Sequence, residues 1–178
     1  MSKKSTQIAL GGMFSALCLM LMFLTGMVPF STYVMPAAAG IMLVPVMEEN
    51  GRKAAVLVYV TVSVLSVFIV PDREAALMFI VLFGYYPITK TALDALRPLP
   101  LRILAKALLF NGMVALGYYV VIVILGLPDI MSDMGDLGRY SALILLGMGN
   151  VVFAGYDFLL KRYIALYKTW FRPTFLRR

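Results

Sequence analysis

The chain has 178 residues, of which 62% are hydrophobic and only 14% are charged. Because a water-soluble domain normally carries about a quarter charged residues, this composition indicates an integral membrane protein. The formal charge of +7 could suit nucleic acid, but the basic residues lie in short clusters between apolar runs, which favours anionic lipid headgroups. With no histidine and one cysteine, Cys18, the sequence excludes disulfides, His or Cys metal sites and the common nucleophilic triads.

Long apolar runs separated by short breaks rich in Pro, Gly or charge predict transmembrane helices along the whole chain. The first run lacks a clear cleavage site, so we expect it to be retained as a helix rather than removed as a signal peptide. Residues 1–160 then form an all-α bundle of six spans, and residues 161–178 form a basic amphipathic tail at the cytoplasmic interface. The predicted spans are 6–28, 33–47, 54–70, 75–93, 103–127 and 140–160.

The distribution of charge predicts the orientation of these spans. With a cytoplasmic N-terminus, every Lys and Arg falls on the inner side except Arg73 and Arg139. Positive-inside sorting produces such a split, so we expect both termini in the cytoplasm of a multi-pass protein. The second run, 33–47, is short and contains two prolines, Pro36 and Pro45, and could instead be a re-entrant hairpin. Losing that crossing would place the two basic termini on opposite sides of the membrane, so the charge distribution favours six spans.

Small residues in the first span predict a closely packed helix face. Gly12 and Ala16 are four residues apart, as are Gly11 and Ser15, so each pair lies on one side of the helix. Two interpretations remain open for the face formed by Ala9, Gly12 and Ala16: packing within this chain, or contact with a helix of another membrane protein.

Polar side chains within membrane spans are candidates for function, although hydrogen bonds between helices are a frequent alternative. Asn111 and Asn150 lie in the interiors of the fifth and sixth spans, as either a structural clasp or a ligand contact. A further group of charged residues falls at the predicted inner ends, where pairing or snorkelling is favoured over a proton path. These residues are Glu48, Glu49, Lys90, Asp94, Lys106 and Asp157.

At the predicted outer ends, Arg73 and Arg139 are unusual because positive charge is otherwise absent there. One interpretation is a pocket in which an arginine meets an anionic ligand group and Tyr118 or Tyr119 stacks on a planar one. The alternative is a local salt bridge among Asp72, Arg73, Glu74 and Arg139. We find no phosphate-binding glycine loop and no acidic cluster suited to magnesium, so we expect no cofactor and no enzymatic activity, and a partner must supply any ATP hydrolysis.

The overall pattern resembles the substrate-binding S component of energy-coupling factor (ECF) transporters. The likeness covers almost the whole chain: six spans, both ends inside, an outer loop after the first helix, and small residues four apart. The family's Ala-x-x-x-Ala coupling motif maps onto 12–16, with Gly12 in place of the first alanine. The distinctive stretch 83–90 suggests a separate branch of small bacterial membrane proteins with an unassigned ligand, and Pro87 is expected to kink or end the fourth helix.

The resemblance implies a bacterial cell-membrane subunit that captures a vitamin-like solute from outside. It also implies two kinds of partner: a transmembrane coupling subunit bound through the first helix at Ala9, Gly12 and Ala16, and two cytosolic ATPases. The candidate solute contacts are Arg73, Asn111, Tyr118, Tyr119, Arg139 and Asn150. The alternative is a non-transporting scaffold or accessory protein of the cell envelope; a lipid-modifying enzyme is disfavoured because no acid/base or metal set is present.

Overall fold

The computed structural model describes residues 3–27, 31–120 and 138–171. All secondary structure within these ranges is helical, as the apolar runs predict. Five stretches in the same ranges are long and apolar enough to cross a membrane, which is compatible with a multi-pass membrane protein. They correspond to the predicted first, third, fourth, fifth and sixth spans and comprise Ser5–Gly26, Arg52–Ile69, Arg73–Asp94, Leu99–Tyr119 and Leu143–Phe171.

The chain divides into two compact units. The first unit comprises Met1–Asp94 and Leu160–Arg178, and the second comprises Ala95–Leu159. The first unit contains α1 (Lys3–Phe23), the 3₁₀ turn η1 (Leu24–Gly26), α2 (Val34–Ile41), α3 (Leu43–Asn50), α4 (Arg52–Ile69), α5 (Arg73–Met78), the π-helical turn η2 (Phe79–Phe83), α6 (Tyr86–Asp94) and η5 (Tyr167–Phe171). The second unit contains α7 (Leu99–Tyr119) and most of α8 (Gly138–Leu166), whose last turns belong to the first unit.

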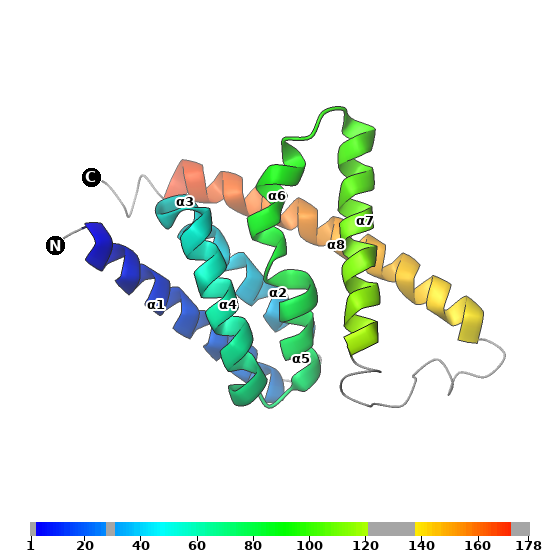
Figure 1. The fold of residues 1–178 in the computed structure, drawn as a ribbon, viewed down its shortest axis with the longest axis horizontal. Helices are drawn as coiled ribbons and strands as arrows, with labels where there is room; N and C mark the ends of the chain where they lie inside the picture. The colour runs from blue at the N-terminus through cyan, green and yellow to red at the C-terminus, as the bar shows by residue number, and fades with distance from the viewer. Residues whose placement is uncertain (1–2, 28–30, 121–137, 172–178) are drawn as a thin grey trace. The chain divides into compact units, whose positions relative to one another are not determined.

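The predicted second span is a broken helix at the centre of the first unit. It consists of α2 and α3, which are separated at Met42 and together contact α1, α4 and the α5–η2–α6 segment (Figure 1). Pro45 explains the break, because its ring nitrogen cannot donate to the carbonyl of Ile41 and its ring crowds that carbonyl. At the end of α2 the Met42 amide donates both to the carbonyl of Ala38, the regular partner, and to that of Ala39, each at 3.2 Å.

The predicted fourth span is also interrupted. It begins as α5, widens into η2 and resumes as α6 after Gly84 and Tyr85. Within η2 the Gly84 amide donates to the carbonyl of Phe79 at 2.7 Å, five residues back instead of four. The interruption confirms the effect expected of Pro87, since a proline perturbs the turn that precedes it.

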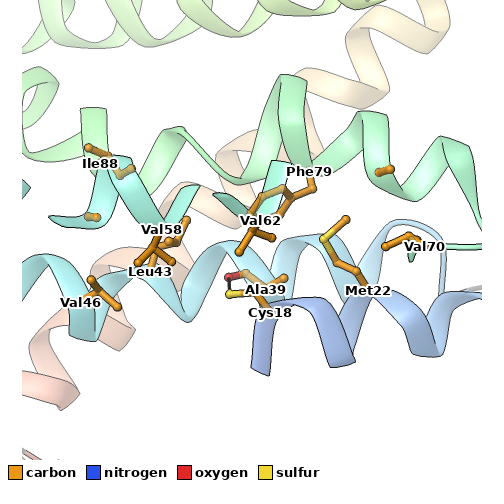
Figure 2. Close-up of a cluster of buried hydrophobic side chains, with 12 residues drawn as sticks. Cys18, Met22, Ala39, Leu43, Val46, Val58, Val62, Val70, Phe79 and Ile88 are labelled. Carbon is orange, nitrogen blue, oxygen red and sulfur yellow. Dashed lines mark hydrogen bonds between the residues drawn. The ribbon is translucent and has the colours of Figure 1, made fainter. Parts of the chain in front are cut away.

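A cluster of buried side chains joins these segments (Figure 2). In lipid, helices gain little from burying apolar area, so close packing and hydrogen bonds hold such a cluster together. The stability of the cluster therefore depends on how closely its side chains fit together. Figure 2 shows the side chains of Cys18 and Met22 of α1 lying beside Ala39 of α2. The other labelled members are Leu43 and Val46 of α3, Val58 and Val62 of α4, Val70, Phe79 of η2 and Ile88 of α6.

The last two predicted spans differ from the structure at their ends. α7 begins at Leu99, four residues before the predicted start, and is described as far as Tyr119; residues 121–127 of that prediction lie outside the described residues. α8 continues past the predicted end at residue 160 to Leu166 and is followed directly by η5. Lys161 and Arg162 do not end it because both are good helix formers.

Replacing Gly84 with alanine is expected to destabilise the first unit. A Cβ at this position would lie 2.8 Å from the Tyr59 ring and 2.9 Å from the Phe79 ring, closer than packed carbon atoms allow. Overpacking of this kind lowers the free energy of unfolding by about 1 to 3 kcal/mol, measurable by thermal unfolding in detergent. Gly12→Ala is the matched control, because nothing lies within 4 Å of a Cβ there. Equal stability of the two variants would contradict the close approach of α4 to η2.

Candidate functional site

The interrupted helices of the first unit leave backbone carbonyls that side chains satisfy. The Tyr59 hydroxyl on α4 donates to the carbonyl of Ile80 at 2.7 Å. In a regular helix that carbonyl would accept from Gly84, whose amide is engaged with Phe79 in η2. A backbone carbonyl without a partner is costly in a bilayer, so Tyr59 stabilises the π-helical turn.

Three further side chains in α1, η1 and the segment before α2 donate to backbone carbonyls of the first unit. The Cys18 thiol donates to the carbonyl of Ala39 at 3.3 Å, one turn before the break at Met42. The Thr25 hydroxyl donates to the carbonyl of Met22 at 2.7 Å, and Ser31 donates to the carbonyl of Thr25 at 3.3 Å. The prolines in the sequence indicate the breaks, but no signal in the sequence marks Cys18 or Tyr59 as donors to backbone carbonyls.

In the second unit, Asn111 of α7 and Asn150 of α8 bind each other. The Nδ2 of Asn111 donates to Oδ1 of Asn150 at 3.2 Å, and the reverse bond measures 3.0 Å. Each Nδ2 also donates to the carbonyl four residues earlier on its own helix, at 2.8 Å. All four amide hydrogens are therefore used, which is the arrangement of a clasp between two helices.

Two more contacts continue this pairing along the helices. Nζ of Lys106 lies 3.0 and 2.9 Å from the two carboxylate oxygens of Asp157. The rings of Phe110 and Phe153 stack with their centroids 4.6 Å apart. As the residue number increases along α7 its partner's number decreases along α8, as in an antiparallel pair. Lys106 and Asp157, two of the charged residues for which pairing or snorkelling was expected, thus pair with each other, and both charges are largely shielded from solvent.

The remaining predicted solute contacts are placed as follows. Tyr118 and Tyr119 occupy the last turn of α7, where Tyr118 is half-buried and Tyr119 is exposed. Arg139 is the second residue of α8, but its side chain lies outside the described residues. Arg73 is an exposed residue at the start of α5, in the first unit. The structure therefore brings together Asn111 and Asn150 from the predicted set.

The residues beside Arg73 have a local structural role. The Asp72 carboxylate accepts hydrogen bonds from the backbone amides of Glu74 and Ala75, at 3.0 and 3.1 Å. Asp72 is thus the N-cap of α5, which satisfies two amides that have no partner inside the helix. The local salt bridge among Asp72, Arg73, Glu74 and Arg139 stays a prediction, because the Arg139 side chain lies outside the described residues.

The two small-residue pairs of α1 differ in their surroundings. A Cβ at Gly11 would meet the Val58 side chain at 3.6 Å, so this side of α1 packs against α4. A Cβ at Gly12 would meet nothing within 4 Å, and Ala9 and Ala16 are exposed like Gly12. The face formed by Ala9, Gly12 and Ala16 is therefore open, while the face with Gly11 is internal.

Charged residues at the predicted inner end of the first unit are paired. Lys90 is only 2% exposed and lies 3.3 Å from the Asp94 carboxylate, one turn later on α6. Its ammonium also lies 5.9 Å from the centre of the Tyr86 ring. Glu48 pairs with Lys168 at 3.1 Å. Pairing lowers the cost of burying these charges.

No protein-family model matches the chain, and no curated protein or solved structure shows detectable similarity to it. What the chain does is therefore inferred from its own residues.

Replacing Tyr59 with phenylalanine is expected to lower the free energy of unfolding by about 1 to 3 kcal/mol, because the carbonyl of Ile80 loses its donor inside the bundle. Thermal unfolding in detergent measures the loss. Tyr33→Phe is the matched control, since Tyr33 is exposed and its substitution should change stability little. Indistinguishable behaviour of the two variants would argue against the role of Tyr59 in η2.

A double-mutant cycle tests the amide clasp. Asn111→Leu and Asn150→Leu each remove both bonds between the side chains, so their effects should not add, with a coupling free energy of about 0.5 to 2 kcal/mol. As a control, Asn111→Leu is combined with Asn50→Leu, because the Asn50 amide donates to the carbonyl of Gln7; these effects should add. Additive effects of Asn111→Leu and Asn150→Leu would contradict the structural clasp and favour the alternative, in which the two amides contact a ligand.

Proposed function

We propose that the chain is the substrate-binding S component of an ECF-type transporter in a bacterial cell membrane. In this proposal it has six spans with both termini cytoplasmic. It captures a vitamin-like small solute at the outer side and delivers it inward together with a transmembrane coupling subunit and two cytosolic ATPases.

The observation that carries the proposal is the open small-residue face of α1. Ala9, Gly12 and Ala16 line one side of this helix and remain exposed, although Gly11 on the neighbouring side packs against Val58. Small residues four apart allow the backbone of another helix to approach closely. A face of this kind suits a coupling subunit, which must hold the S component through its first helix.

The broken helix supports the proposed count of spans. α2 and α3 have eight residues each, so the pair extends about 25 Å at 1.5 Å per residue. Irregular backbone at membrane depth is tolerated where protein surrounds it, and α2–α3 is contacted by the other helices of residues 1–94. Adding this crossing to the five long helices gives six and keeps both basic termini on one side, in agreement with the charge distribution.

The solute site is proposed at the outer ends of the helices, with Arg73 and Arg139 as partners for an anionic group and Tyr118 and Tyr119 for a planar one. Asn111 and Asn150 use their amide hydrogens within the protein, so at this site they would offer a solute the second lone pair of each Oδ1.

Copurification from the native host tests the proposal. A coupling subunit, two ATPases and a small solute should copurify with the wild-type protein and be identified by mass spectrometry. Gly12→Leu and Ala16→Leu should each reduce recovery of the coupling subunit at least about tenfold, because a large side chain blocks close helix approach. Gly112→Leu is the matched control: Gly112 is an open, exposed glycine on α7, and its substitution should preserve recovery. Absence of the coupling subunit from the wild-type sample would refute the proposal.

The amide clasp favours a second candidate, a non-transporting scaffold or accessory protein of the cell envelope. Asn111 and Asn150 use their amide hydrogens on each other and on their own helices, as expected of structural groups. A scaffold would copurify with envelope proteins and no solute, so the same mass spectrometry separates the two functions.

A further inference from the structure

The last described segment of the chain contacts the acidic end of α3. The Tyr167 hydroxyl donates to Oε1 of Glu49 at 3.3 Å, and Nζ of Lys168 lies 3.1 Å from Oε1 of Glu48. Two consecutive residues of η5 thus bind two consecutive residues of α3, far away in the sequence. All four belong to the first unit.

The helix that receives these contacts has a joint at each end. At Met42 the backbone passes from α2 to α3 across the turn disrupted by Pro45. At its other end Gly51 has a φ of +83°, a conformation that glycine adopts without strain. α3 is therefore a short rigid segment whose position depends on its side-chain contacts.

The two contacts differ in strength. Tyr167 is buried, at 3% exposure, and its ring stacks on Phe171 with centroids 5.4 Å apart. Lys168 is half exposed, at 51%, and its partner Glu48 is 14% exposed. An ion pair that water reaches is weak and exchanges easily, whereas the Tyr167 side chain is held out of water, although its 3.3 Å bond to Glu49 is long for an O–H···O contact. The contact therefore has one half that is shielded from water and one that is readily released.

We infer that Tyr167 and Lys168 form a clasp that holds α3 in its packed position, and that release of the clasp lets α3 move about Met42 and Gly51. Movement of α3 would open the centre of the first unit, because Leu43 and Val46 are fully buried members of its cluster (Figure 2). The inference does not depend on the transport proposal.

Cysteine labelling tests the clasp. In a Cys18→Ala background, Val46→Cys reports on α3 and Val62→Cys reports on α4; both valines are fully buried. The rate of reaction with N-ethylmaleimide is measured in detergent, with and without Tyr167→Phe and Lys168→Gln together. The clasp predicts about tenfold faster labelling at position 46, the factor expected for loss of one ordinary hydrogen bond and one exposed ion pair together, and an unchanged rate at position 62.

The reversed ion pair provides a positive control. Glu48→Lys combined with Lys168→Glu should label more slowly at position 46 than either substitution alone. An unchanged rate at position 46 in the clasp variant would overturn the inference, as would equal acceleration at positions 46 and 62, which would indicate general loosening. If the double substitution aggregates, Tyr167→Phe alone is measured, and an unchanged rate at position 46 again overturns the inference.

Discussion

Burial of a helical backbone away from water leaves every interrupted hydrogen bond in need of a partner, and this constraint shapes the first unit. Its helices break at Met42 and at η2, where regular bonding fails. The Tyr59 hydroxyl satisfies the carbonyl of Ile80, and the Cys18 thiol supplements the bonding of Ala39. Because each donor comes from a neighbouring helix, the same bonds that satisfy the breaks also fix the spacing of α1, α2, α4 and η2. Disorder at a break would thus spread to the packing around it.

The second unit meets the constraint differently, since α7 and α8 are regular helices whose polar side chains face each other. Asn111, Phe110 and Lys106 each have a partner on α8, so amide, aromatic and ionic contacts occur in register. These contacts do not donate to backbone groups at a helix break. They favour one alignment of α7 and α8 over others in which the two apolar helices are shifted along each other. The first unit is stabilised by side chains that bond to the backbone at helix breaks, and the second by side-chain pairs between α7 and α8.

Hydrophobic runs and prolines predict much of this fold from the sequence. The runs locate most helix ends to within a few residues, although α8 continues to Leu166 instead of ending at residue 160, and Pro45 and Pro87 mark the two interruptions. The partner of each freed carbonyl is not predictable, because Tyr59 lies 21 residues from Ile80 and tertiary packing alone brings them together. The pairing of Asn111 with Asn150 is hidden for the same reason, although their presence inside spans is a visible signal. The roles of Arg73 and Arg139 in binding a solute stay predictions.

The length of α8 has a mechanical consequence. It contains 29 residues, so it measures about 44 Å, whereas the hydrocarbon layer of a bilayer is about 30 Å thick. Such a helix must lean or project into the headgroups, and the balance changes with the lipid that surrounds it. A change in membrane thickness would therefore change how much of this helix lies in the headgroup region.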